Sequence, residues 1–556
     1  MKRISKIAAA VLSLTTMLGC TACNRKSEDV TIDKSKMQLY VKYYNGGYGD
    51  EWLTKLCSEF EGMYAGVKFS NGKTGVEIVP EFTRGDINGP EGMKGNRNNV
   101  FLLENKDYYT YVSAKSFLDI TDVVNDYAVT GLETKETEKT IATKIPEAYD
   151  EFLNIEGRYY AVPFFESSMN LNYDVDLFEQ KCLYFAAGKT AENFTEEDFK
   201  DESKIGDLFV SDPDDDRAFG PDGRENTSDD GLPATYKDFR ALTIQMKIAG
   251  VTPFVWNTSD VDYLTGLVND MWANNEGEEQ MKLNLTFEGS AATIVDTIAD
   301  DGTVTLKPAT TINADNYKLL QRQKGKLDAI DFAKLLLDDG TGNKNSRNYY
   351  SKSFDSGFSH TIAQSYFVNP DANGIGDNPI GFLVDGSWWY NEAKVTGRNF
   401  AVLPLPKTDA SKIGTPNTKL SDRSSLIFIS SETKREVVPV AKAFVSFLQS
   451  DHALRTYTEY TNTLRAMTYT LTNESLAKMS SYGKSVYDAR NSGDTVILPW
   501  SPLTALARKN ASLLEWRTYG FSTTSMDKNP LVYLKDHIKE KNITKKYFEA
   551  IWNYRK

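Results

Sequence analysis

Residues 37–64, MQLYVKYYNGGYGDEWLTKLCSEFEGMY, decide the fold class of this chain. In the first part of this stretch apolar and polar residues alternate, and β-branched and aromatic residues are frequent, which is typical of a half-buried strand. Glycines at 46, 47 and 49 then break the pattern, and from Glu51 onward apolar residues recur at helical spacing. Strand, glycine turn and helix together predict the opening of an α/β unit.

Further apolar stretches extend this unit. VEIVPEF at 76–82 and NNVFLL at 98–103 are predicted as strands, and residues 108–124 as a helix followed by a turn. Strands that alternate with helices favour a sheet with crossover helices. Much later in the chain, SSLIFISS at 424–431 precedes a helical stretch at 437–450. We interpret this pair as a second visit of the chain to the first sheet.

The length, composition and net charge limit the classes of protein to which this chain can belong. With 556 residues, of which 40% are apolar and 25% charged, the chain is expected to form two or more globular lobes. This composition excludes disorder, collagen and a multi-span membrane protein. The chain carries 64 Lys and Arg against 77 Asp and Glu, a formal net charge of −13. Such an acidic balance disfavours nucleic-acid binding.

The N-terminus reads as a processing signal. Basic residues at 2, 3 and 6 precede an apolar run at 7–18 that is too short to span a bilayer stably. The run ends in Met-Leu-Gly-Cys20, which resembles the lipobox of bacterial lipoproteins. We therefore predict a signal peptide at 1–19, acylation of Cys20 (with Cys23 as the alternative) and a polar tether at 20–36. A plain secretory signal remains the competing interpretation.

The other cysteines indicate no special chemistry. Besides Cys20 and Cys23, the chain has only Cys57 and Cys182. So few cysteines form no disulfide framework, and none has the neighbours of a metal-binding CxxC pair. The sequence therefore supports neither a redox site nor a zinc site.

Several strings resemble a known family when they are taken together and in order. They are YYNGGYGDEW (43–52), YYAVPFFES with NYDVDLF (159–178), GPDGRENTSDDGLPATYKDF (220–239), GVTPFVW (250–256), DGSWWYNEA (385–393), FAVLPLPK (400–407) and LRAMTY (464–469). Together with the lipoprotein signal they are similar to the extracellular solute-binding proteins, family 1, of bacterial ABC sugar importers, the maltose-binding-protein-like group. The resemblance is thinnest at 185–235 and at 300–380.

The resemblance implies a two-lobed periplasmic-binding-protein-like (type II) α/β fold with hinge crossings and a ligand cleft between the lobes. It implies lobe I at 37–164 plus 426–462, and lobe II at 165–425 plus 463–556. The expected role is capture of a carbohydrate, an oligosaccharide, for delivery to the transmembrane subunits of an ABC permease, without catalysis. We expect a monomer that is held by a lipid anchor on the extracytoplasmic face of the cell membrane and needs no cofactor.

A sugar site needs aromatic faces for C–H surfaces and fixed polar groups for hydroxyls. Trp388, after a predicted strand, matches the position where family members stack a tryptophan on sugar; Trp389 is expected in the core. The turn at 45–48 offers helix-terminal amides, although a plain tight turn competes as an explanation. The predicted ligand-binding residues are Asn45, Tyr48, Trp52, Glu166, Trp256, Asp385, Trp388, Arg465 and Trp500.

An acidic insertion raises the question of calcium. Between 212 and 230 the chain carries closely spaced aspartates, and oxygen ligands are those that Ca²⁺ prefers. We predict structural Ca²⁺ at Asp222, Asp229 and Asp230, with a solvated turn as the alternative because the spacing departs from that of an EF-hand loop. The stretch at 369–378 is a weaker calcium candidate.

Other functions stay open at this point. A secreted glycosidase would need two carboxylates facing each other across a cleft, and no such pair is marked by its context. A binding protein for peptides or for uronate-bearing glycans is the other alternative, although the acidic charge disfavours polyanions.

Overall fold

The computed structural model describes most of the chain after the N-terminal segment. The described residues are 32–83, 87, 89–104, 108–257, 262–355, 357–369, 378–393, 397–421, 425–491, 493, 495–499 and 530–555. The predicted signal peptide, Cys20, Cys23, Trp500 and nearly all of the weaker calcium candidate at 369–378 lie outside these residues.

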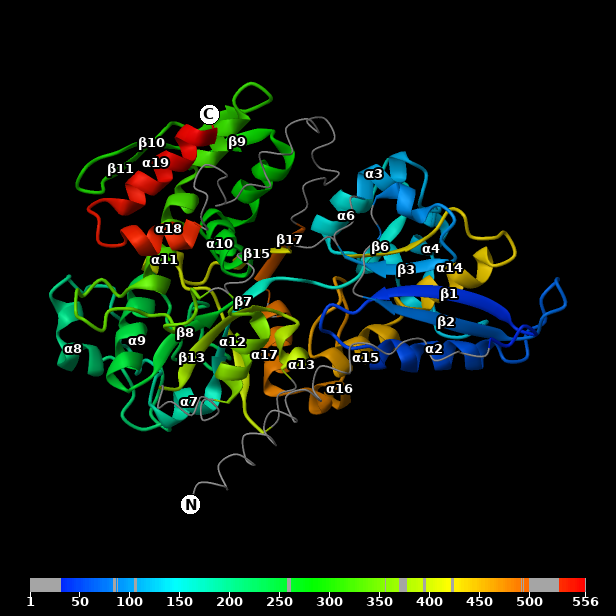
Figure 1. Cartoon of the computed structure of the whole chain (residues 1–556), viewed down its shortest axis with the longest axis horizontal. Coiled ribbons are helices and arrows are strands. Elements are labelled where there is room, and N and C mark those ends of the chain that lie inside the picture. The colour runs from blue at the N-terminus through cyan, green and yellow to red at the C-terminus, as the bar shows by residue number, and fades with distance from the viewer. Residues whose placement is uncertain are drawn as a thin grey trace, which may run out of the picture.

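Figure 1 shows two lobes, each built on its own sheet. The elements of lobe I are the strands β1 (Met37–Tyr44), β2 (Val76–Thr83), β3 (Val100–Leu103), β4 (Tyr127–Val129), β5 (Lys135–Thr140), β6 (Ala161–Pro163) and β16 (Leu426–Ile429), and the helices α2 (Glu51–Tyr64), η2 (Pro90–Met93), α3 (Tyr108–Ser113), α4 (Thr121–Val124), α5 (Ile141–Lys144), α6 (Glu147–Leu153), α14 (Val438–Phe447) and α15 (Asp451–Thr461). This arrangement confirms the α/β prediction for the start of the chain.

The sheet of lobe I has five strands in the order β2-β1-β3-β16-β6. β1 pairs in parallel with β2 and β3, whereas β16 pairs antiparallel with β3 and β6. The return of the chain through 426–429 is therefore a strand of the first sheet. Helix α2 buries Trp52, Leu53, Leu56 and Phe60, whose spacing places them on one helix face.

Lobe II is the larger lobe in Figure 1. Its strands are β7 (Met169–Asp174), β8 (Thr252–Trp256), β9 (Gly289–Ala291), β10 (Val295–Ile298), β11 (Val304–Leu306), β12 (Thr310–Ile312), β13 (Ile380–Gly386), β14 (Phe400–Leu403), β15 (Asn417–Ser421) and β17 (Thr495–Pro499). Its helices are α7 (Val175–Gln180), η3 (Asp198–Lys200), α8 (Glu202–Gly206), α9 (Tyr236–Ile248), α10 (Asp262–Thr286), η4 (Tyr317–Arg322), α11 (Lys324–Leu337), α12 (His360–Val368), α13 (Trp389–Glu392), η6 (Ala410–Lys412), α17 (Ser481–Asn491), α18 (Pro530–His537) and α19 (Ile543–Arg555). The short helix α16 (Asn473–Lys478) follows α15.

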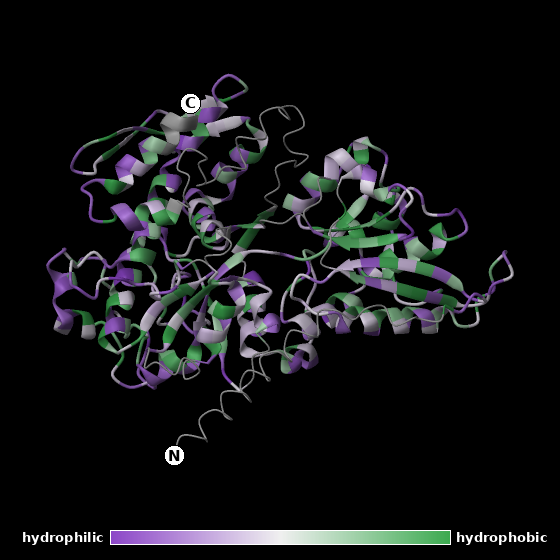
Figure 2. Ribbon diagram, in the orientation of Figure 1, coloured by the Kyte–Doolittle hydropathy of each residue, from purple (hydrophilic) through white to green (hydrophobic). Residues whose placement is uncertain are grey.

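The main sheet of lobe II has four strands in the order β14-β7-β13-β8. β13 runs parallel to β8 and antiparallel to β7, and β14 is also antiparallel to β7. The carboxyl ends of β8, β13 and β14 therefore meet at one edge of the sheet, together with the start of β7. Figure 2 shows apolar colouring along the strands of both sheets and more polar colouring on the outer helices, as expected for two covered sheets.

Local signals fix the ends of several helices. Thr235 caps α9 with a capping box: its side chain accepts a hydrogen bond from Asp238 N, and the Asp238 side chain accepts one from Thr235 N. Gly250, just after the helix, has a φ of 77°. The start of α9 thus follows from the sequence itself, in which an acidic residue comes three positions after a threonine. Helix α10 is kinked at Gly277 (φ 76°, ψ 170°), where two helical segments meet, and it ends at Thr286.

Two crossings between the lobes lie side by side. The residues between β6 and β7 pair with the segment that follows α15, through a bridge of Phe165 with Arg465. Glu166 N donates to Leu464 O at 3.2 Å, and Ala466 N donates to Phe164 O at 3.2 Å. In the described part of the chain, no helix has the length and apolar character needed to cross a bilayer.

Candidate functional site

A cavity of about 490 Å³ opens in lobe II next to the crossings. Its floor is the sheet edge just described, represented by Asn170 on β7, Ser387 after β13 and Leu403 on β14. The crossings contribute Glu166 and Leu464. Ligands of open α/β sheets bind at such edges, and the volume falls within the roughly 300–1,000 Å³ usual for ligand pockets.

A two-stranded ribbon forms a second wall. β15 and β17 pair in parallel, with Asn417 opposite Thr495 and Lys419 opposite Ile497. These four residues line the cavity. Thr418 and Val496, which lie between them on the two strands, line a smaller cavity of about 230 Å³. The ribbon therefore separates two cavities, because successive side chains of a strand point to opposite faces.

The acidic insertion forms a third wall. Asp222 N donates to Asp229 Oδ2 at 3.0 Å, and the Thr227 hydroxyl donates to Asp229 Oδ1 at 2.6 Å. Arg224 pairs with Asp222 at 2.9 Å. Burial raises the pKa of the Asp229 carboxyl. Gly220 is required here, because a Cβ at this position would lie 2.2 Å from the carbonyl oxygen of Asp229.

Opposite the insertion, an ion pair connects helix α17 to a crossing. Arg490 Nε lies 3.1 Å from Glu166 Oε1 and 3.3 Å from Oε2. The Glu166 charge raises the pKa of Arg490. Since Glu166 is also held by Leu464 through its backbone, the pair fixes α17 against both crossings.

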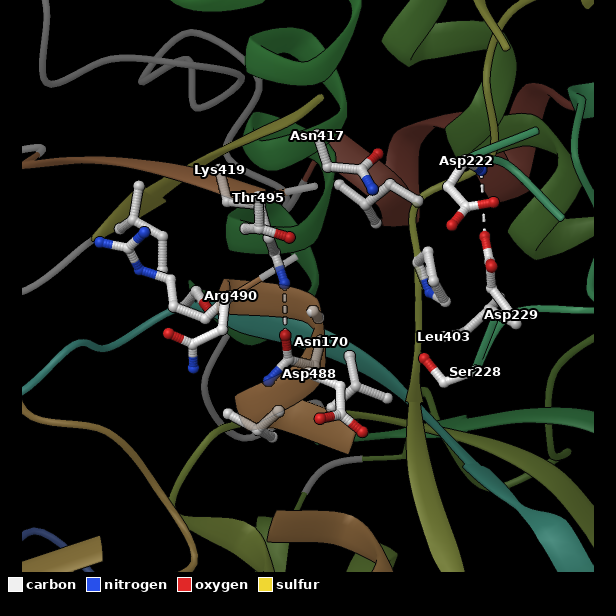
Figure 3. A pocket seen from close by; sticks show the side chains of 18 of the residues that line it. Asn170, Asp222, Ser228, Asp229, Leu403, Asn417, Lys419, Asp488, Arg490 and Thr495 are labelled. Carbon is white, nitrogen blue, oxygen red and sulfur yellow. Dashed lines mark hydrogen bonds between the residues drawn. The ribbon is translucent and has the colours of Figure 1, made fainter. Parts of the chain in front are cut away.

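Lys419 lies between these two sides. Its ammonium donates to Asn170 Oδ1, and Figure 3 shows this pair near the middle of the view, with Arg490 on one side and Asp222, Ser228, Asp229 and Leu403 on the other. Burial lowers the pKa of Lys419, and Asp270 opposes that shift. The described lining thus combines charged and amide groups with aliphatic side chains, and it contains no aromatic ring.

The structure brings part of the predicted site together, although not around the cavity. The Tyr48 hydroxyl lies 3.1 Å from Ser387 Oγ, and the Tyr48 ring packs on Phe165 with centroids 4.6 Å apart. Asn45 accepts a hydrogen bond from Gly49 N at 2.9 Å, so its amide shapes the turn. Among the predicted ligand-binding residues, Glu166 lines the cavity.

Three predicted contacts are buried in the core instead. Trp52, Trp256 and Arg465 each have 0% exposed surface. Trp52 Nε1 donates to the Tyr43 hydroxyl at 3.3 Å, and the Trp256 ring packs on Phe354 at 5.4 Å. These side chains have no surface to offer a ligand in this structure, so their predicted role is corrected to packing.

Arg465 holds the crossings together. Its guanidinium donates to the carbonyl oxygens of Phe164, Pro163 and Leu448 and to Gln449 Oε1. Burial lowers its pKa to about 10. These acceptors are all neutral groups of the protein, so Arg465 ties the crossings together and offers no free donor surface to a hydroxyl group.

The strand end at 385–388 also differs from expectation. Asp385 is buried, accepts a hydrogen bond from Gln364 Nε2 at 3.0 Å, and has a pKa raised well above its usual value by burial. The Trp388 ring covers Gly386 and meets Tyr263 edge-on at 5.8 Å. It is 6% exposed, and its neighbour Ser387 lines the cavity in its place. The predicted tryptophan platform is therefore absent from the described lining.

The calcium prediction gains no geometric support. Among the described residues, no cluster of three or more His, Cys, Asp or Glu side chains is arranged to hold a metal ion. The carboxylates of Asp222 and Asp229 are occupied by Arg224, by Thr227 and by backbone amides, while Asp230 accepts from Asn226 N at 2.8 Å.

Sequence reasoning missed most of the lining. Asn170, Lys419, Asp488 and Arg490 come from segments that are far apart in the chain, and none carries a motif. A usable signal was the alternation in NTKLS at 417–421, which places Asn417 and Lys419 on the same strand face.

A model of the family described as bacterial extracellular solute-binding protein matches residues 55–479. No curated protein matches the chain. Among solved structures, the solute-binding protein RafE in complex with raffinose gives a TM-score of 0.51 at 14% identity, covering 93% of this chain and 98% of that one.

Two other solved structures are similar at lower scores. A chitin oligosaccharide binding protein gives a TM-score of 0.49 at 13% identity, over 94% of this chain and 98% of that one. An ABC substrate-binding protein from Listeria monocytogenes in complex with cycloalternan gives 0.49 at 13% identity, over 93% and 97%. At these identities the likeness concerns the fold alone.

Proposed function

The chain belongs to the bacterial extracellular solute-binding protein family, and on that premise we propose that it captures a carbohydrate and delivers it unaltered to the permease of an ABC transporter. The observation that carries this proposal is the cavity at the strand ends of lobe II, beside the crossings. Its fixed amides, carboxylates and cations suit a rim of hydroxyl groups, and its aliphatic side chains suit the C–H faces of a sugar ring.

The raffinose complex of RafE supports the same ligand class, because its fold covers nearly all of this chain. We further propose that the protein works as a monomer and performs no catalysis. It is held on the extracytoplasmic face by a lipid on Cys20, with Cys23 as the alternative. A Cys20→Ser variant that is released from membranes would support the anchor, and a variant that stays bound would contradict it.

Calcium at Asp222, Asp229 and Asp230 stays a prediction. A metal ion that binds only the folded state raises the melting temperature. Addition of a chelator to the purified protein is therefore the test, and an unchanged melting temperature with and without calcium would contradict the prediction.

The experiment that tests the main proposal is a thermal-shift and calorimetric screen with raffinose, chitin trisaccharide and neutral malto-oligosaccharides. A ligand at about 100 times its Kd stabilises the folded state by about 2.7 kcal/mol, so a bound sugar gives a clear shift. The recovered sugar is then weighed by mass spectrometry. A shift with a peptide mixture but with no saccharide, or release of cleaved sugar, would overturn the proposal.

A further inference from the structure

We infer that the segment formed by α17 and β17, residues 481–499, selects the ligand, and that Asp488 is the specificity-determining residue which directs the cavity to neutral or amine-bearing saccharides and away from uronates. This inference rests on the proposed function. It concerns the same cavity and adds which side chain reads the ligand and what chemistry it favours.

The position of this segment relative to the family match is the first argument. The family model ends at residue 479, yet the cavity is lined beyond that point by a group of residues on α17 and β17. They include Asp488, Arg490, Asn491 and Thr495. The part of the chain that the family model matches therefore builds the floor, whereas α17 and β17, which follow it, contribute to the walls.

The second argument is the state of the carboxylates in the lining. Glu166 is paired with Arg490, Asp222 is paired with Arg224, and Asp229 accepts from Thr227. Asp488 is exposed on the cavity wall and makes no hydrogen bond or ion pair with the residues that the structure describes. Partial burial raises the pKa of Asp488, and the charge of Lys484 opposes part of that rise. Asp488 thus offers two acceptor oxygens to a ligand.

The third argument is the state of the cations. Arg490 and Arg224 are bound to protein carboxylates, and Lys419 is buried with its ammonium on Asn170. Lining carboxylates outnumber lining cations by four to three. A ligand carboxylate would have to compete for cations already bound by protein groups, whereas a hydroxyl pair or an ammonium meets the Asp488 carboxylate, to which no described residue is bonded.

Aliphatic side chains line part of the cavity on the side of the acidic insertion. Leu403, Pro404 and Leu405 line the cavity along the end of β14, and Figure 3 shows Leu403 on the side opposite Arg490. A ring bound between the two walls would turn its C–H face to the leucines and its hydroxyl or amino rim to α17. The sequence-based expectation of stacking on indole rings is thereby replaced by packing on aliphatic side chains.

The test compares Asp488→Asn with the native protein by isothermal titration against chitin trisaccharide, its deacetylated cationic counterpart, raffinose and trigalacturonate. Native protein is expected to bind at least one of the first three and to bind trigalacturonate at least about tenfold more weakly. In Asp488→Asn, affinity for the preferred sugar falls about tenfold, and the discrimination against trigalacturonate shrinks by a similar factor. Asp207→Asn, an exposed carboxylate that does not line the cavity, serves as the matched control and leaves both values unchanged.

The outcomes separate this inference from the proposed function. If the native protein binds a neutral sugar and Asp488→Asn binds it with the same affinity and selectivity, the inference fails while the function stands. If trigalacturonate is the preferred ligand of the native protein, the inference also fails. If no saccharide binds the native protein at all, the proposed function fails. Asp488→Ser, read in the same way, replaces Asp488→Asn if the asparagine variant melts at a lower temperature.

Discussion

The junction between the lobes and the cavity of lobe II use side chains in opposite ways. At the junction, aromatic rings gather into what we call the junction cluster: Tyr43, Tyr48, Trp52, Phe164, Phe165 and Tyr457, with centroid distances of 4.6–6.3 Å between contacting pairs. The cavity beside it is lined, in its described part, by aliphatic and polar groups without a ring. The aromatic residues of this protein therefore gather at the junction between the lobes and not around the cavity.

Two arginines make the same contrast. The Arg465 guanidinium lies over the rings of Phe164 and Tyr457, 5.1 and 5.7 Å from their centroids, and donates to neutral carbonyl and amide oxygens. Arg490 faces the cavity and is neutralised by Glu166. The Arg465 guanidinium ties backbone segments together in the buried core, whereas the Arg490 guanidinium presents a paired charge to the cavity. Mutations in the two regions should therefore separate stability from binding.

The largest expected effect comes from a substitution that disrupts the junction cluster. Trp52→Ala removes a fully buried indole that contacts Tyr43, Phe164 and Tyr457, so the free energy of unfolding should fall by about 3–5 kcal/mol. Urea denaturation measures this loss. The affinity of the folded fraction for its sugar should stay the same, because Trp52 lies outside the cavity lining.

Trp52→Phe is the matched control for this variant. It keeps a ring in the cluster and should lose less stability than Trp52→Ala. A large loss of sugar affinity in either variant, measured where the protein is still folded, would contradict the assignment of Trp52 to packing.

The next prediction concerns the pH dependence of stability, which we expect from a buried carboxyl group of lobe II. Glu276, beside the kink of α10, accepts from Gly325 N and from the Thr293 hydroxyl, both at 2.6 Å. Burial raises its pKa from 4.5 to about 7. Because the folded-state pKa is raised, its contribution to stability is fully present below about pH 4.5 and is lost as the pH rises through about 7.

Glu276→Gln should remove this dependence. A shift of this size corresponds to about 3 kcal/mol, so the native protein should lose on the order of 3 kcal/mol relative to Glu276→Gln between about pH 4.5 and about pH 8. Denaturant unfolding at several pH values measures the difference. Glu202→Gln, at an exposed position, is the control, and parallel curves for native protein and Glu276→Gln would show the prediction to be wrong.

The sequence predicted where helices and strands lie better than it predicted which of their side chains face the cavity and which face the core. The strand, turn and helix at 37–64 and the cap at Thr235 follow from local periodicity and turn chemistry, and the structure has them. Whether an aromatic residue after a strand faces a ligand or the core depends on register and on partner strands. A single position separates Trp388, which covers Gly386, from Ser387, which lines the cavity.

The cavity itself depends on long-range pairing that local patterns do not contain. β15 and β17 come together as parallel neighbours although many residues separate them, and only their pairing places Lys419 and Thr495 on the same wall. The acidic insertion offers another example. Its composition indicated a solvated or calcium-binding turn, whereas its position as a wall follows from contacts such as that of Gly220 with Asp229.

The smallest expected effect concerns the ion pair that joins the two regions. Glu166 belongs to a crossing and Arg490 to the cavity wall, with side-chain exposures of 7% and 28%. A double-mutant cycle with Glu166→Gln and Arg490→Gln isolates their coupling, which for a partly buried pair should be about 1 kcal/mol in the free energy of unfolding. The pair Lys94 with Glu91, exposed on lobe I, is the control and should show no measurable coupling.

The same cycle can be run on sugar binding, where it sharpens the comparison. If the pair serves to position α17 for the ligand, both single variants should weaken binding, and the double variant should weaken it by less than the sum of the two. Additive losses in binding would mean that Glu166 and Arg490 contact the ligand independently. In that case the crossing would be part of the ligand site in its own right, and junction and cavity would not be separate at this point of contact.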